Sequence, residues 1–124
     1  MQYARLEISG NAVANPTATF NGTTRVELRI AATPRHQDAS GNWKDGHTAF
    51  VSVIAFGDLA ENIIESVQMG TAVKVTTKAR TSEWVDEGTG DKRSRLEFIA
   101  SEFAIDLTHQ KAAVTKTSRT TAGV

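Results

Sequence analysis

The chain has 124 residues, enough for one domain that buries a hydrophobic core without disulfides or a structural metal. Hydrophobic residues make up 40% and charged residues 23%, and no apolar run approaches the roughly 18 residues that a membrane span needs. The 14 basic residues balance 14 acidic ones, which excludes a bulk positive charge, and the lack of Cys excludes disulfides, zinc–thiolate sites and cysteine nucleophiles.

The first half of the chain contains three segments with the period-two alternation of β-strands, residues 3–11, 24–32 and 48–57. The second has the cleanest pattern, with aliphatic side chains at every other position and charged ones between them. The third is largely apolar on both faces, and Phe50 and Phe56 share one of them. It is therefore predicted either to be buried on both sides or to present aromatic rings to something flat.

The two segments between these strands, residues 15–23 and 34–46, are rich in Asn, Gly, Pro and other turn-forming residues. We expect the first to be a connecting loop or hairpin turn and the second to be an exposed loop. The second segment also carries aromatic and positively charged side chains, namely Arg35, His36, Trp43 and Lys44.

In the second half, a short helix is predicted to begin at Asp58, whose side chain can cap it, and to end near Gly70. Two more alternating segments follow, residues 71–84 and 92–107, joined by a turn at residues 86–91.

Five strands with one helix between the third and the fourth define the plan of an OB-fold, an all-β, five-stranded Greek-key barrel. We expect residues 1–107 to form this domain. Residues 108–124 have no sustained periodicity and many Thr and Ser, and they are predicted to be a flexible tail without an acidic tip.

The sequence contains none of the common nucleotide-binding, metalloprotease or hydrolase motifs, and its three His residues lie far from metal-ligand spacing. We therefore expect no catalytic residues, no bound metal and no cofactor. Single-stranded nucleic acid needs a different set of groups: aromatic rings on which bases stack, at roughly 1 to 3 kcal/mol each, and cations for the phosphates.

Phe50, Phe56 and Trp84 are the candidate stacking rings. One face of the segment 71–84 places Trp84 in line with three cations, Lys74, Lys78 and Arg80. Other interpretations remain open for these residues, because each ring could belong to the core and the cations could serve only solubility. Phe98 and Phe103 are predicted to be core residues.

Four patterns in the chain resemble those of the bacterial single-stranded DNA-binding proteins. They are G-N at residues 10–11, T-x-[WF]-x-x-V-x-x-F-G-x-L-A-E-N at 48–62, G-[ST]-x-V-x-V at 70–75 and R-T-x-x-W-x-D at 80–86. The resemblance covers roughly residues 4–106 and implies an OB-fold that wraps single-stranded DNA, usually as a homotetramer.

By position, Phe50, Phe56 and Trp84 match the family's stacking aromatics, and Arg80 matches a base that contacts the DNA backbone. His36 falls where another stacking Trp is common, and Trp43 is a candidate to replace it in part.

The chain also departs from the family pattern. Ser52, Ser82 and Glu83 occupy places where the family often has Arg or Lys, so the salt dependence of binding should be shallower. The glycine-rich tail with an acidic tip that recruits other enzymes is missing, which argues against tail-mediated recruitment. A phage-encoded protein, a tail-less paralogue or a truncated chain would have these features.

The sequence thus predicts a non-catalytic, cytoplasmic protein that binds and protects single-stranded DNA in replication, recombination or repair. Its expected partners are single-stranded DNA and further copies of itself, with a tetramer favoured over a dimer. The cations expected to neutralise phosphates are Lys74, Lys78, Arg80, Arg93, Arg95, Arg35 and Lys44. The alternative is an OB-fold assembly module that binds a protein partner and has only incidental affinity for nucleic acid.

Overall fold

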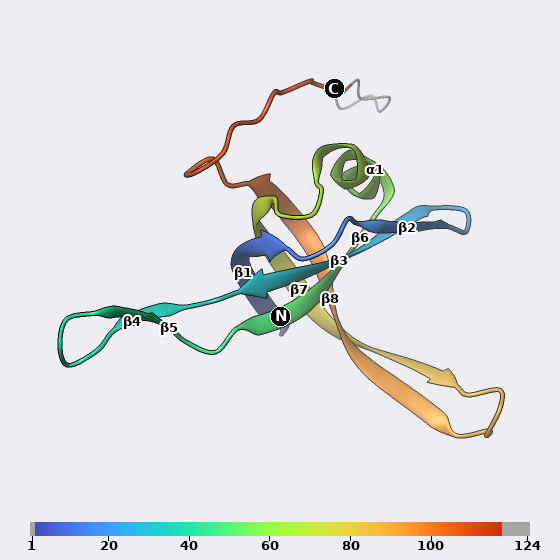
Figure 1. The fold of residues 1–124 in the computed structure, drawn as a ribbon. Coiled ribbons are helices and arrows are strands. Elements are labelled where there is room, and N and C mark those ends of the chain that lie inside the picture. The colour runs from blue at the N-terminus through green and yellow to red at the C-terminus, as the bar shows by residue number, and fades with distance from the viewer. Residues whose placement is uncertain (1, 118–124) are drawn as a thin grey trace.

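The computed structural model describes residues 2–117, and this part of the chain forms eight strands and one helix (Figure 1). In chain order the elements are β1 (Ala4–Ala12), β2 (Thr17–Phe20), β3 (Thr24–Ala32), β4 (Arg35–Gln37), β5 (Trp43–Asp45), β6 (Ala49–Phe56), α1 (Gly57–Ser66), β7 (Ala72–Val85) and β8 (Lys92–Ile105). No helix in this part of the chain is long and apolar enough to cross a membrane.

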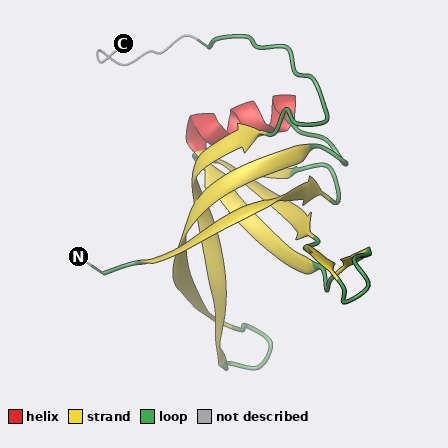
Figure 2. Ribbon diagram, turned by 90° about the vertical axis from the view of Figure 1, so that its left-hand side faces the viewer, coloured by secondary structure: helices red, strands yellow, loops and turns green. Residues whose placement is uncertain are grey.

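Five of the strands close into a barrel in the order β1-β7-β8-β6-β3. The ring is completed where Asn11 and Ala12 of β1 pair with Ala31 and Ile30 of β3. The helix follows the third barrel strand in the chain and lies across one end of the barrel (Figure 2). The predicted OB-fold is therefore confirmed.

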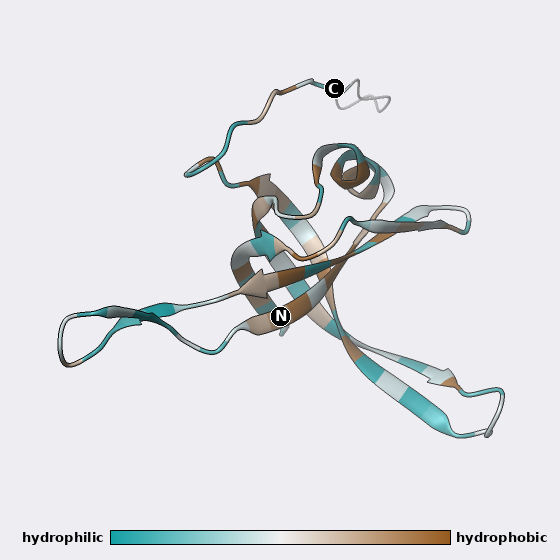
Figure 3. Ribbon diagram, viewed as in Figure 1, coloured by the Kyte–Doolittle hydropathy of each residue, from teal (hydrophilic) through white to brown (hydrophobic). Residues whose placement is uncertain are grey.

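The core of the barrel is aliphatic and comes from the inward positions of the alternating strands. Its largest fully buried side chains include Leu28, Ile30 and Val53, and α1 closes it with Ala60 and Ile63. Phe98 and Phe103 pack against this core, as predicted. Apolar residues gather in the barrel strands and α1, whereas the β4–β5 hairpin is largely hydrophilic (Figure 3).

Three hairpins extend from the barrel: β2–β3, β4–β5 and β7–β8 (Figure 1). The prediction that residues 34–46 form a loop was wrong, because β4 and β5 pair within it. The hairpin turn expected in the segment 15–23 is present at residues 21–23, and the segment also contains β2. These strands have three or four residues, all exposed, so they show no alternation. The β4–β5 turn is held by Asp38, whose Oδ1 accepts the backbone N–H groups of Ser40 and Asn42, each at 2.9 Å.

The helix begins and ends differently from the prediction. Its N-cap residue is Phe56 and no side chain caps it, because Gly57 adopts a φ of +67° and turns the chain from β6 directly into the helix. Asp58 instead lies in the first turn, where its charge favours the positive end of the helix dipole. The helix ends at Ser66, and Gly70 belongs to the connection to β7, where its N–H donates to the Ala12 carbonyl at 2.8 Å.

Residues 106–117, which follow β8, have no regular secondary structure. The side chain of Gln110 nevertheless contacts the barrel, where its Nε2 donates to the Ala72 carbonyl at 2.8 Å. The remainder of the predicted tail, residues 118–124, lies outside the described residues.

Candidate nucleic-acid interface

One outer surface of the barrel runs across the neighbouring strands β3, β6, β8 and β7. Arg25 of β3 lies opposite Phe56 of β6, and Arg80 of β7 lies opposite Glu97 of β8. Side chains directly opposite each other on paired strands point to the same side of the sheet. We call this surface the central face and define it by Arg25, Glu27, Arg29, Phe50, Ser52, Ile54, Phe56, Arg80, Arg95 and Glu97.

Both phenylalanines of β6 are exposed on the central face. The exposed fraction is 55% for Phe50 and 38% for Phe56, so the interpretation of either ring as a core residue was wrong. The core takes the opposite parity of β6, represented by Val53 and Ala55. Since six residues of a strand span about 20 Å, the two rings form separate platforms.

Each of these rings has a guanidinium group beside it. The Arg29 guanidinium lies 4.9 Å from the centroid of the Phe50 ring, and that of Arg80 lies 5.7 Å from the centroid of Phe56. A cation at this distance is attracted by the ring's negative face. Arg29 is also directly opposite Ser52, so β3 supplies a cation next to the position where β6 lacks one.

Sequence reasoning did not assign Arg25 and Arg29 to the site. Both occupy charged positions that alternate with the aliphatic positions of β3, but the sequence did not show which strand lies beside β3. One signal in the sequence could have found them. The strands now seen as β3 and β6 flank a turn-rich segment, which makes them candidates for an antiparallel pair, and that pairing places the two arginines beside Phe50 and Phe56.

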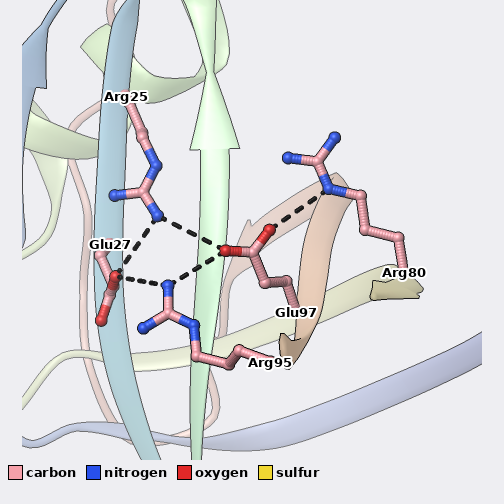
Figure 4. A network of polar contacts seen from close by, with 5 residues as sticks. All are labelled: Arg25, Glu27, Arg80, Arg95 and Glu97. Carbon is pink, nitrogen blue, oxygen red and sulfur yellow. Dashed lines mark hydrogen bonds and ion pairs between the residues drawn. The ribbon is translucent and has the colours of Figure 1, made fainter. Parts of the chain in front are cut away.

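Glu97 lies at the centre of an ion network on this face, with a side chain only 8% exposed (Figure 4). Its Oε1 accepts a hydrogen bond from Arg80 Nε at 3.3 Å, and its Oε2 accepts one from Arg95 Nη2 at 3.0 Å. Arg25 Nη2 lies 3.9 Å from the same Oε2. Burial alone would raise the pKa of Glu97, but the hydrogen bonds from Arg95 and Arg80 lower it below the ordinary value. Glu97 is therefore charged at neutral pH.

The network borders an open hollow of about 200 Å³ on the central face. Phe50 and Ser52 line it together with Arg95 and the two acidic side chains of the network, Glu27 and Glu97. The hollow thus combines an aromatic surface with both signs of charge.

The β7–β8 hairpin carries the central face outward from the barrel. Trp84 is 47% exposed and lies on β7 at the same parity as Arg80, directly opposite Arg93. Arg93 is itself paired, with its Nε 3.5 Å from Asp86 Oδ2. The structure therefore places Trp84 outside the core, next to a cation, but beyond the network around Glu97.

The β4–β5 hairpin holds the four predicted residues of the segment 34–46 apart from the central face. Trp43 is 61% exposed, and His36 lies opposite Lys44. The cations of this hairpin contact acids of the same hairpin: Arg35 Nε lies 3.3 Å from Asp45 Oδ1, and Lys44 Nζ lies 3.5 Å from Asp38 Oδ2. These residues form a second group of exposed ring and charges.

Lys74 and Lys78 lie on the same side of β7 as Arg80, toward the part of the strand that pairs with β1. Lys78 Nζ is 5.6 Å from the centroid of the Tyr3 ring, and Lys74 lies opposite Ser9. The cations predicted for β7 therefore do share one side of the strand, and of these three only Arg80 takes part in the ion network around Glu97.

An OB-fold barrel with exposed rings and guanidinium groups on one outer surface has the features of a domain that binds single-stranded nucleic acid. Comparison with known proteins identifies it further. The chain belongs to the single-strand binding protein family, whose model matches residues 4–106.

The chain is similar to several bacterial proteins named single-stranded DNA-binding protein. The relative from Corynebacterium glutamicum is 36% identical over 117 residues, which are 92% of this chain and 52% of that protein. The relative from Mycobacterium leprae is 34% identical over 117 residues, covering 92% of this chain and 69% of that protein. The chain thus spans about half the length of the first relative and about two thirds of the second.

The fold is also similar to a solved structure, that of a small single-stranded DNA-binding protein from Streptomyces coelicolor. The two chains are 30% identical with a TM-score of 0.69, and the match covers 86% of this chain and 97% of the other. The relatives' names support the prediction of a DNA-binding protein, and none supports the alternative of an assembly module.

Proposed function

We propose that this protein binds single-stranded DNA without reading its sequence, and that it protects the strand during replication, recombination or repair. It does so without catalysis, in the bacterial cytoplasm or in that of a phage-infected host. The observation that carries the proposal is the central face, where Phe50 and Phe56 are both exposed and each has a guanidinium group beside it. Membership of the single-strand binding protein family supports it.

In this proposal bases stack on Phe50, Phe56 and Trp84, and the β4–β5 hairpin adds Trp43 and His36 as a further contact. Phosphates are neutralised by the cations inferred from the sequence, with Arg25 and Arg29 added from the structure. The full set is Arg25, Arg29, Arg35, Lys44, Lys74, Lys78, Arg80, Arg93 and Arg95.

Several of these cations already have an acidic partner in the protein, as Arg93 has Asp86 and Arg35 has Asp45. A phosphate that takes over such a cation leaves a carboxylate to be neutralised again, which offsets part of the counterion release that makes binding salt-dependent. We therefore expect the logarithm of affinity to fall with the logarithm of salt concentration less steeply than about 0.7 per contacted phosphate.

Titration with oligo-dT while following tryptophan fluorescence tests the proposal, because Trp43 and Trp84 are the chain's two tryptophans. We expect quenching that saturates and weakens with added salt. The absence of quenching, or quenching that does not respond to salt, would contradict the proposed DNA binding.

We further propose that the protein acts as a homo-oligomer, with a tetramer favoured over a dimer. Within the described residues, most of β1 pairs with β7 only, and the other edge of β1 pairs with β3 only at Asn11 and Ala12. An open strand edge of this kind can pair with a second chain. Analytical ultracentrifugation of the free protein tests this assembly, and a monomer at micromolar concentration would contradict it.

A further inference from the structure

An acidic side chain at the centre of a DNA-binding surface needs an explanation, because its charge repels phosphate. Glu97 is such a side chain, and it is nearly buried beneath three arginines from three strands, Arg25, Arg80 and Arg95. A carboxylate taken out of water is costly unless it is paired and hydrogen-bonded. Both oxygens of Glu97 are paired, so the site is built around this charge.

The geometry at Arg80 shows which part of the guanidinium Glu97 uses. The hydrogen bond to Glu97 comes from Nε, the inner nitrogen, and within the described residues neither terminal nitrogen of Arg80 hydrogen-bonds the carboxylate (Figure 4). An arginine has five N–H donors in a rigid plane, so a bond at Nε fixes the plane and leaves the outer edge open. That outer edge is the one able to hold a phosphate through two parallel hydrogen bonds.

Glu27 belongs to the same network but differs in its burial and contacts. It is partly exposed, and its Oε1 lies 3.6 Å from Arg25 Nη2 and 4.0 Å from Arg95 Nη2. These separations are too long for hydrogen bonds, so Glu27 contributes charge without fixing an orientation. The network thus contains one acid that holds arginines in place and one that only neutralises them.

We propose that Glu97 is a positioning residue for nucleic-acid binding, which fixes Arg80 through Nε with its terminal donors free, and holds Arg95 through Nη2, before the strand arrives. The inference rests on the proposed function. A free arginine side chain loses considerable rotamer freedom when a ligand fixes it, and a protein that has already fixed it binds more tightly. For Glu97 this gain exceeds the repulsion between its charge and the phosphates.

The variants Glu97→Gln and Glu27→Gln separate positioning from charge, because each removes one negative charge from the same network. We expect Glu27→Gln to bind oligo-dT about twofold more tightly at low salt, because the carboxylate of Glu27 no longer repels the phosphates. Glu97→Gln should bind about fivefold more weakly than the unaltered protein despite the same change in net charge. If Glu97→Gln binds as tightly as the unaltered protein or more tightly, the inference is wrong.

A second readout follows the arginine itself. In ¹⁵N-resolved NMR spectra of the free protein, the Nε–H signal of Arg80 should be shifted and protected from exchange by its bond to Glu97. We expect this signal to lose its protection in Glu97→Gln and to keep it in Glu27→Gln, with the backbone amide spectrum unchanged in both. A protected Arg80 signal in Glu97→Gln would overturn the proposed positioning.

If Glu97→Gln does not fold, Arg80→Lys answers the same question from the other partner. Lysine keeps the positive charge and can donate to Glu97, but its single ammonium lacks the rigid planar fork that would present two parallel donors to a phosphate. We expect binding at least about threefold weaker, and unchanged binding would overturn the inference. The unaltered protein is titrated in parallel: if it does not bind oligo-dT, the proposed function fails, whereas normal binding with an unaffected Arg80→Lys contradicts only the role of Glu97.

Discussion

The central face and the β4–β5 hairpin both combine exposed rings with cations, but they differ in what supports them. The central face lies on long barrel strands, and its arginines converge on a nearly buried carboxylate. The hairpin consists of two strands of three residues, and both members of its Arg35–Asp45 pair are exposed. One surface is ordered by the barrel, and the other by the pairing and side-chain contacts within its own hairpin.

This difference decides where binding energy should come from. Exposed ion pairs contribute about 0.2 to 1 kcal/mol, and side chains that become ordered only on binding cost part of what their contacts contribute. The central face has its rings and guanidinium groups in place before the ligand arrives. We therefore expect it to dominate affinity, with the hairpin adding a smaller and more adaptable contact.

The largest expected effect comes from removing both rings of the central face. Phe50→Ala combined with Phe56→Ala should weaken oligo-dT binding by about 2 to 6 kcal/mol, because each stacked base contributes about 1 to 3 kcal/mol. The fold should survive, since both rings are exposed. Fluorescence titration measures the affinity, and circular dichroism checks the fold.

Phe20→Ala is the matched control for the double variant. Phe20 is also exposed, but it lies opposite Thr24, so it points to the side of the β2–β3 pair opposite to that of Arg25 and the central face. Its removal should leave affinity unchanged. Equal losses in Phe20→Ala and the double variant would mean that exposed rings bind DNA anywhere on the surface, and the central face would lose its special status.

Trp84→Ala should have the next largest effect, about 1 to 3 kcal/mol of binding free energy, for the loss of one stacking platform. Trp84 lies on the projecting part of β7, so its loss should not unfold the barrel. Titration by fluorescence anisotropy with a labelled oligo-dT measures the affinity without relying on tryptophan. A variant that unfolds would instead assign Trp84 a structural role.

Trp43→Ala tests the hairpin and should cost no more than about 1 kcal/mol, at the low end of the range for a stacked base. The same anisotropy titration serves here, with Trp84→Ala as the reference. A larger loss for Trp43→Ala than for Trp84→Ala would reverse the comparison and make the β4–β5 hairpin the main binding element.

The sequence predicted those parts of the fold that alternate against a buried core. The predicted segment 24–32 coincides with β3, because Val26, Leu28 and Ile30 must face inward at every second position. The same reasoning failed for β2, β4 and β5, whose residues are all exposed and leave no apolar pattern to detect. It also misplaced the helix cap, since the start of α1 depends on the positive φ of Gly57.

The candidate site was predictable where one strand supplies it and unpredictable where several strands meet. The alternation along one strand put Phe50 and Phe56 on a common face, which the structure places outward. The roles of Arg25 and Arg29, and the network at Glu97, depend on which strands lie side by side. No periodicity within a single segment contains that information.

The smallest expected effect concerns stability in acid and compares a buried with an exposed carboxylate. Because its arginines lower the pKa of Glu97 in the folded protein, the charged form adds stability above the ordinary pKa near 4.5. This contribution is lost as the pH falls through the lowered pKa, because the carboxylate then becomes protonated. We expect it to be on the order of 0.5 kcal/mol, since the arginines are half exposed and solvent screens them. Urea unfolding of the unaltered protein and of Glu97→Gln measures this contribution from about pH 7 to about pH 3. The free energy of unfolding should be higher for the unaltered protein at pH 7, and the difference between the two proteins should shrink as the pH falls.

Asp45→Asn, which removes the acid of the exposed hairpin pair, is the control for the change in charge. If acidification instead raises the free energy of unfolding of the unaltered protein relative to that of Glu97→Gln, the charged form of Glu97 destabilises the folded state, and the expected stabilisation by its arginines is contradicted.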